Sequence, residues 1–180
     1  MDKETYLEKK NRRLVLVTGG QRSGKSLFAE KMALASGQAP VYLATAIAAD
    51  DEMRKRVEIH KKRREKQWVN IEEPLEPGEA DIKAGSTVLL DCLTLLATNW
   101  FFKENEDIHS AFAMIRQQID KLTGKDITLI AVTNEIGLGG VSENKMQRRF
   151  TDLQGMVNQY VADIADEVYL LISGIPLKIK

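Results

Sequence analysis

The stretch Gly19-Gly20-Gln21-Arg22-Ser23-Gly24-Lys25-Ser26 decides the fold of this chain. It fits the pattern G-x-x-x-x-G-K-[ST], in which a glycine-rich loop cradles phosphate groups. The apolar run over residues 14–18 predicts a buried strand before the loop, and residues 27–36 predict a helix after it. The pattern requires strand, loop and helix in this order. We therefore predict a P-loop that binds a nucleoside triphosphate.

Each part of this loop has a physical role in holding phosphate. Glycines let successive backbone N–H groups converge on one point, and the helix N-terminus adds partial positive charge there. Lys25 supplies a full charge for the outer phosphates, and Ser26 offers a hydroxyl to Mg²⁺. We expect all eight residues 19–26 to contact nucleotide, with Lys25 also catalytic and Ser26 a metal ligand.

Composition limits the possible classes of protein. The chain has 180 residues, with 26 Lys and Arg balanced by 26 Asp and Glu, so it lacks the basic excess of a nucleic-acid binder. Its single cysteine, Cys92, forms no internal disulfide and favours a reducing cytoplasm. No stretch is long and apolar enough to span a membrane. Residues 1–13 are charged and lack the apolar core of a secretory signal, so we expect an extension before one domain over residues 14–180.

The remainder of the chain alternates between strand and helix patterns. This alternation predicts an α/β fold, a P-loop domain whose mostly parallel sheet has helices on both faces and a C-terminal β-hairpin. The expected strands cover residues 41–45, 69–72, 87–91 and 127–132. The expected helices cover residues 50–66, 93–103, 110–122 and 146–164. The expected hairpin has strands over 168–172 and 177–179, around Ser173-Gly174-Ile175-Pro176.

Asp91 ends the apolar run over residues 87–91. P-loop proteins place a magnesium-binding acid at the carboxyl end of such a strand, where ligand crevices of open α/β sheets also lie. An acid here could instead cap a helix or lie in a loop; beside a P-loop, we predict that Asp91 binds Mg²⁺ together with Ser26. We expect the neighbouring Cys92 to pack in the core, because nothing in the sequence lowers its pKa.

Residues 54–66 hold eight Lys or Arg around one histidine, His60. Two interpretations stay open at this point. The segment could be a solvated basic helix with a half-buried imidazole. Alternatively, a neutral imidazole could attack phosphorus while the cations stabilise the charge that develops on the phosphoryl oxygens. His109 lacks such surroundings, and we expect it to be exposed near a helix start.

The segment 133–140 follows a buried strand and contains three glycines. Asn134 and Glu135 could bind substrate, order magnesium or orient an attacking hydroxyl. An ordinary turn followed by a helix cap explains the same pattern equally well.

Taken together, separated motifs resemble those of the bifunctional adenosylcobinamide kinase/adenosylcobinamide-phosphate guanylyltransferase family of cobalamin biosynthesis. The resemblance covers residues 14–180 and leaves out the N-terminal extension. Its motifs are Val17-Thr18-Gly19-Gly20 with Arg22-Ser23-Gly24-Lys25-Ser26, Ala44-Thr45, Asp50-Asp51-Glu52-Met53, His60-Lys61, Asp91-Cys92-Leu93-Thr94, Thr98-Asn99, Val132-Thr133-Asn134-Glu135-Ile136-Gly137, Glu143-Asn144, Val157-Asn158-Gln159, Ala165-Asp166-Glu167-Val168 and Ser173-Gly174-Ile175.

This resemblance implies two reactions, a RecA-like fold and a homotrimer. The terminal phosphate of ATP or GTP would move to the hydroxyl of adenosylcobinamide. GTP would then give GMP to His60, which matches the family's guanylylated histidine, and the substrate phosphate would collect it as adenosylcobinamide-GDP. The resemblance also implies nucleotide-contacting positions beyond the loop, at Ala44, Thr45, Ala46, Lys61, Lys62, Arg63, Arg64, Glu72 and Asp91.

The chain departs from this family at two places near His60. Some members carry a second histidine where this chain has Ile59, so here only one imidazole is available. Those members have an Asp-Gly pair where this chain has Lys61-Lys62-Arg63-Arg64-Glu65, which predicts either a stiffer, more cationic loop or a longer helix. Two other functions fit the P-loop itself: a kinase for another small alcohol with His60 merely structural, or a nucleotide-dependent switch that binds a protein partner.

Overall fold

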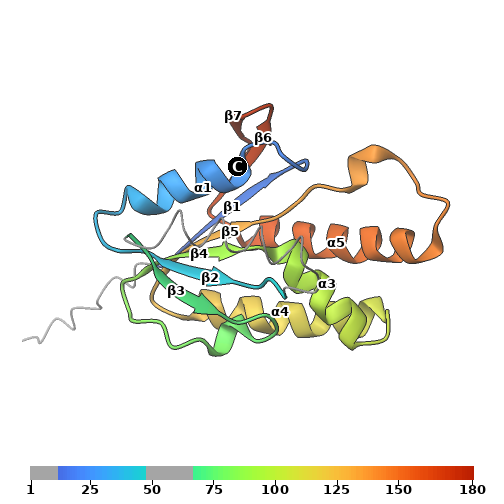
Figure 1. Ribbon diagram of the computed structural model, residues 1–180, viewed down its shortest axis with the longest axis horizontal. Coiled ribbons are helices and arrows are strands. Elements are labelled where there is room, and N and C mark those ends of the chain that lie inside the picture. Colours follow the sequence, from blue (N-terminus) through green and yellow to red (C-terminus); the bar gives the residue numbers. More distant parts are fainter. Residues whose placement is uncertain (1–11, 48–66) are drawn as a thin grey trace, which may run out of the picture.

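A computed structural model describes residues 12–47 and 67–180 of the chain, which form one seven-stranded sheet with helices on both faces (Figure 1). The predicted helix over 50–66 and nearly all of the predicted extension over 1–13 lie outside these residues. The strands are β1 (Arg13–Gly19), β2 (Val41–Ala44), β3 (Val69–Glu72), β4 (Thr87–Asp91), β5 (Thr128–Val132), β6 (Glu167–Ile172) and β7 (Ile175–Lys178). The helices are α1 (Lys25–Leu34), α3 (Leu93–Lys103), α4 (Ile108–Gly124) and α5 (Lys145–Ile164), with short 3-10 helices η1 (Pro77–Glu79) and η2 (Gly137–Gly139).

The sheet has the order β3-β2-β4-β5-β1-β6-β7, and only its last pair, β6 and β7, is antiparallel. β1 lies inside the sheet between β5 and β6, while β4 is separated from it by β5. The predicted α/β class and mostly parallel sheet are therefore confirmed. Since the six parallel strands point the same way, their carboxyl ends share one edge of the sheet.

The core has two layers because alternate residues of a strand face opposite sides of a sheet. Leu14 and Leu16 of β1 pack with α3, α4 and α5, whereas Val15 and Val17 pack with α1 on the other face (Figure 1). All four side chains are at most 5 % exposed. A continuous apolar run is expected for a parallel strand that is covered on both faces.

Helix boundaries follow their caps. Asp107 accepts a hydrogen bond from the backbone N–H of Ser110 at 2.7 Å, so α4 begins at Ile108 rather than at the predicted residue 110. This bond is also the main reason why the pKa of Asp107 is lowered. His109 is exposed in the first turn, as predicted.

The long helix predicted from apolar steps of three and four is α5, which Asn144 caps through the backbone N–H of Gln147. Its middle positions, Leu153, Val157 and Val161, are fully buried, but Ile164 at its end is 38 % exposed. The apolar periodicity therefore predicts the helix correctly, but it overestimates how deeply the side chain of Ile164 is buried at the C-terminal end.

The C-terminal hairpin is confirmed with a shorter turn than predicted. Only Ser173 and Gly174 connect the strands, both with positive φ, at 51° and 83°. This is the favoured conformation of a two-residue hairpin. The expectation that Pro176 belongs to the connection was wrong, because it lies in β7 opposite Leu171. An edge strand tolerates proline because its outer N–H needs no partner in the sheet.

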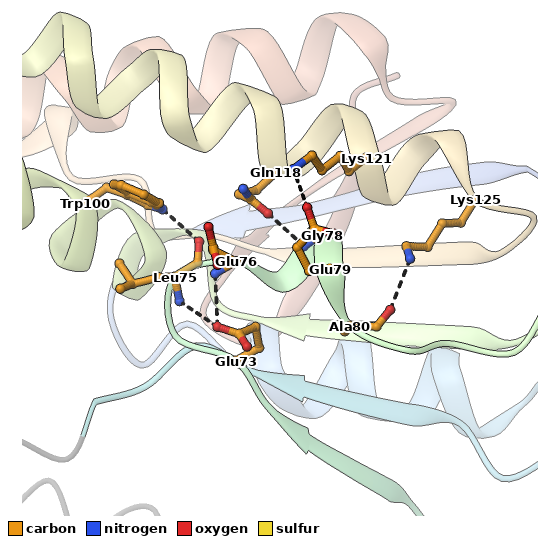
Figure 2. A network of polar contacts seen from close by, with 10 residues as sticks. All are labelled: Glu73, Leu75, Glu76, Gly78, Glu79, Ala80, Trp100, Gln118, Lys121 and Lys125. Carbon is orange, nitrogen blue, oxygen red and sulfur yellow. Dashed lines mark hydrogen bonds and ion pairs between the residues drawn. The ribbon is translucent and has the colours of Figure 1, made fainter.

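The connection between β3 and β4 is fixed to two helices by polar contacts (Figure 2). Trp100 of α3 donates its indole N–H to the carbonyl of Leu75 at 2.8 Å, and Gln118 of α4 accepts from the backbone N–H of Gly78 at 3.1 Å. Lys121 pairs with Glu79, and Lys125 donates to the carbonyl of Ala80 at 3.1 Å. An irregular segment thereby satisfies buried backbone groups that a strand would pair in a sheet.

Two glycines give a matched test of this packing. A Cβ at Gly78 would lie 2.7 Å from the Cβ of Lys121 and 2.9 Å from the backbone oxygen of Gln118, whereas a Cβ at Gly155, inside α5, would meet nothing within 4 Å. We expect Gly78→Ala to lower the free energy of unfolding by about 1–3 kcal/mol through overpacking. We expect Gly155→Ala to raise it by about 1 kcal/mol through helix propensity. Urea unfolding of both variants measures these changes, and equal effects from the two substitutions would contradict the described packing.

Candidate functional site

The phosphate loop connects β1 to α1 and is fixed against the C-terminal hairpin. A Cβ at Gly19 would lie 2.5 Å from the carbonyl oxygen of Leu171, so only glycine fits where the loop leaves the strand. Gly24 has φ 95° at the N-cap of α1, a conformation that glycine adopts readily. The backbone N–H of Gly174 donates to the carbonyl of Ser23 at 2.9 Å. The β6–β7 turn therefore holds the loop from outside.

Lys25 begins α1 and is only 7 % exposed. Its ammonium donates to the carbonyl of Gly20 at 2.7 Å, inside the loop. Burial lowers the pKa of Lys25, and the negative charge of the nearby Asp91 acts in the opposite direction. Lys25, from the predicted motif, and Asp91, the predicted metal-binding acid, therefore lie close enough for their charges to interact.

Two buried hydroxyl groups lie at the loop, one inside it and one at the end of β1. Ser23 and Thr18 are each 8 % exposed. Among residues 12–47 and 67–180, neither hydroxyl has a hydrogen-bond partner. Because a buried polar group without a partner costs free energy, these hydroxyls retain capacity for a polar ligand.

Asp91 ends β4 as predicted and is partly buried. The hydroxyl of Tyr42, on the neighbouring β2, donates to its carboxylate. This bond orients Asp91. It could not be predicted from the sequence, where Tyr42 is one residue of an apolar strand pattern.

Three of the predicted positions outside the loop form a row across the sheet edge. Ala44 of β2 is the cross-strand partner of Glu72 on β3 and of Asp91 on β4. Val132 of β5 continues the row from Asp91 to Val17 of β1, two residues before the loop begins. Parallel pairing thus brings Glu72, Ala44 and Asp91 to the edge at which the phosphate loop lies.

The buried side chain of Thr45 connects the end of β2 to the backbone just after β4. Its hydroxyl donates to the carbonyl of Cys92 at 2.8 Å and accepts from the Cys92 N–H at 2.9 Å. Asn99 donates to the carbonyl of Thr45 at 2.8 Å. The Thr45 hydroxyl is therefore already bonded within the fold, and the nucleotide contacts predicted at Ala44, Thr45 and Ala46 stay predictions.

Cys92 is buried, and burial is the largest cause that raises the pKa of its thiol to about 12. A thiol with this pKa is protonated near neutrality and is a poor nucleophile. The expected packing role agrees with this environment.

A magnesium ion at this edge would need oxygen ligands from the nucleotide. In the part of the chain that the structure describes, no group of three or more His, Cys, Asp or Glu side chains could hold a metal. Ser26 and Asp91 offer the hard oxygen donors that Mg²⁺ prefers, and Mg²⁺ commonly takes few protein ligands together with substrate phosphates. These residues fit such an ion.

His60 and the cations Lys61, Lys62, Arg63 and Arg64 lie outside the described residues. The described chain reaches that segment from Ile47, just beyond the carboxyl end of β2. It returns at Gln67, before β3. The roles predicted for these five residues stay predictions.

The segment after β5 lies beside the loop. The backbone N–H of Thr133 donates to the carbonyl of Val17 at 3.0 Å, and that of Glu135 donates to the carbonyl of Gly19 at 2.9 Å. Asn158 of α5 donates to the carbonyl of Asn134 at 3.0 Å. In the sequence, Asn158 appears only as part of a family motif. A side-chain amide on the buried face of an otherwise apolar helix is the one feature of the sequence that could have indicated this contact.

None of the helices in the described ranges is long and apolar enough to cross a membrane.

Comparison with known proteins identifies the family of the chain. The family model for cobinamide kinase / cobinamide phosphate guanyltransferase matches residues 15–179. A bifunctional adenosylcobalamin biosynthesis protein of Escherichia coli is 38 % identical, with 93 % of this chain and 99 % of that protein covered. A protein of the same name from Salmonella typhimurium is 39 % identical with the same coverage. One from Pseudomonas aeruginosa is 36 % identical, with 92 % and 96 % covered.

Among solved structures, the flagellar accessory protein FlaH from Methanocaldococcus jannaschii has a TM-score of 0.45 and 14 % identity, with 94 % of this chain and 79 % of that chain covered. A likeness at this level carries no argument about function. The sequence relatives and the family model, in contrast, cover nearly the whole chain and confirm the predicted family and its enzyme class. The chain belongs to the cobinamide kinase/cobinamide phosphate guanyltransferase family.

Proposed function

We propose that this protein phosphorylates adenosylcobinamide with ATP or GTP and then transfers GMP from GTP to the product, through a guanylyl group on His60, giving adenosylcobinamide-GDP. The observation that carries the proposal is the shared sheet edge of the phosphate loop, Lys25 and Asp91, in a chain that belongs to this family. A single-function kinase or a nucleotide-dependent switch would share the loop, but the family match over residues 15–179 favours the bifunctional enzyme.

In the first reaction, the chain's own groups position the triphosphate and offset its charge. Loop amides and the α1 N-terminus face the phosphates, and Lys25 adds a full positive charge near the terminal phosphoryl group. Such a charge matters because phosphoryl transfer depends mainly on positioning and electrostatic stabilisation. A bound Mg²⁺, held by Ser26 and Asp91, would supply further neutralisation of the phosphate oxygens.

The second reaction divides one difficult displacement into two easier ones. A nitrogen of His60 attacks the α-phosphorus of GTP, and the bond from that phosphorus to the bridging oxygen breaks as pyrophosphate leaves. The phosphate of the first product then attacks the same phosphorus, and the bond to the imidazole breaks. Lys61, Lys62, Arg63 and Arg64 are candidates to offset charge on the transferred group.

The proposal includes an assembly and a location. A homotrimer follows from the family resemblance, and exposed apolar side chains on the edge strand β7 support association: Ile175 is 70 % exposed and Leu177 55 %. The cytoplasmic location and the lack of a nucleic-acid partner stay predictions from the lone cysteine and the balanced charge.

Lys25→Ala tests the phosphate site. It removes a charge-assisted contact, and we expect kcat/KM of both reactions to fall by roughly two decades or more. Lys31→Ala, which removes an exposed lysine from the last turn of the same helix, is the matched control and should leave both rates within about twofold of wild type. Near-normal rates in Lys25→Ala would contradict the assignment.

His60→Ala tests the nucleophile. Wild-type protein incubated with α-labelled GTP and Mg²⁺ should retain about one GMP per active subunit. Acid should release the label and base should not, because protonation of the bound nitrogen makes imidazole a good leaving group. His60→Ala should lose the adduct and guanylyl transfer and keep kinase activity, whereas His109→Ala should keep both. Label that maps to Lys61, or adenosylcobinamide-GDP formed by His60→Ala, would rule out this mechanism.

The trimer is tested by light scattering of the purified full chain. At micromolar concentration we expect a mass about three times that of one chain. A stable monomer with full activity in both reactions would overturn this assembly.

A further inference from the structure

We propose that Glu135 is the carboxylate that orients the acceptor hydroxyl and takes its proton in the kinase step, and that Asn158 positions it. This inference rests on the proposed function, because it assigns a residue to the first of the two reactions.

The position of Glu135 follows from the strand order. β5 lies between β4, which ends in Asp91, and β1, which leads into the phosphate loop. Two backbone bonds continue the β5–β1 pairing beyond the strands, from Thr133 to Val17 at 3.0 Å and from Glu135 to Gly19 at 2.9 Å. The second of these fixes the backbone of Glu135 beside the first glycine of the loop.

The carboxylate of Glu135 is partly exposed, and only some of its hydrogen-bond acceptor positions have a donor. One oxygen accepts from the backbone N–H of Gly137 at 3.0 Å, and the other lies 3.5 Å from the side-chain nitrogen of Asn158. A carboxylate offers about four acceptor positions. These neutral donors orient the group and leave positions for a hydroxyl.

The side chain of Asn158 is fixed by a buried network. Its oxygen accepts from the hydroxyl of Thr133 at 2.7 Å and from the amide of Gln154 at 2.8 Å. Its nitrogen donates to the carbonyl of Asn134 at 3.0 Å and toward Glu135. All four hydrogen-bonding positions of the amide are filled, so rotation of this group would break every one of these contacts.

This network lies in the core, where burying apolar side chains would cost less free energy than burying polar ones. Thr133, directly after β5, is 0 % exposed. Gln154 is 0 % and Asn158 8 % exposed, on a helix whose buried face otherwise holds Leu153, Val157 and Val161. Buried polar groups are tolerated when they bond to one another, and they rigidify what they hold. Here the element that they hold is the segment beside the phosphate loop.

Of the two reactions, only the kinase step requires a base. In the kinase step, the acceptor oxygen bonds to the terminal phosphorus, the bond from that phosphorus to the bridging oxygen breaks, and the nucleoside diphosphate leaves with the electron pair. The hydroxyl proton goes to the Glu135 carboxylate and from there to solvent. In guanylyl transfer, the attacking groups are a neutral imidazole and a phosphate anion, so no hydroxyl proton has to be removed.

The test is the ratio of the two activities in full-length Glu135→Gln. Kinase kcat should fall by about 10²-fold or more, with the KM for adenosylcobinamide within about threefold of wild type. Guanylyl transfer to chemically supplied adenosylcobinamide phosphate should stay within about threefold. Glu135→Asp should recover part of the kinase rate, because it keeps the carboxylate. Asp152→Asn, which removes an exposed carboxylate from α5, should leave both rates unchanged.

Asn158→Ala tests the positioning role, with Gln159→Ala, at an exposed neighbouring position, as its control. We expect Asn158→Ala to lower kinase kcat by about tenfold, to leave KM for the acceptor near wild type and to spare guanylyl transfer. Equal losses in both reactions would show a merely structural role and overturn the proposal, as would a kinase rate in Glu135→Gln near that of wild type. Wild-type protein that phosphorylates no adenosylcobinamide would instead overturn the proposed function, and the role of Glu135 with it.

Discussion

The parallel backbone pairing of β1 with β5 is the interaction on which the rest of the site depends. It brings Val132, and through it Asp91 of β4, level with Val17. It also extends beyond both strands, to the bonds between Thr133 and Val17 and between Glu135 and Gly19. Because all these groups leave parallel strands in the same direction, the phosphate loop, the acid of β4 and the segment after β5 meet at one edge. A shift of this register would separate all three.

A second constraint holds the loop in shape from both sides. On one side, the carbonyl of Leu171 in β6 lies so close that Gly19 tolerates no side chain, and Gly174 of the β6–β7 turn donates to the carbonyl of Ser23. On the other side, Asn158 of α5 holds the segment after β5 by donating to the carbonyl of Asn134, and farther along the same edge Asn99 of α3 donates to the carbonyl of Thr45. Rigid support of this kind matters because charge stabilisation requires groups that are already in place when the reaction begins.

Much of this arrangement could be predicted from the sequence. The motif at 19–26, the apolar runs before it and at 87–91, and the periodicity of the last long helix predicted β1, the loop, β4 and α5, because each is a local pattern. Interactions between distant residues could not be predicted in this way. The bond from Tyr42 to Asp91 joins positions far apart in the chain, and the Thr133–Gln154–Asn158 network joins a residue after β5 to two polar residues on the apolar side of α5. The hairpin shows the same limit, since an edge position, known only from the sheet, is what admits Pro176 to a strand.

A crystal structure of the full chain with Mg²⁺ and a GTP analogue that resists transfer, with an imido group between the β- and γ-phosphates, tests the central claim most directly. We expect the phosphates to lie on the amides of residues 20–26, with Lys25 at the outer phosphate and the ion bound by Ser26 and by Asp91, directly or through water. A triphosphate bound at the opposite edge of the sheet, or one on the loop with Lys25 still bonded only to the carbonyl of Gly20, would contradict it.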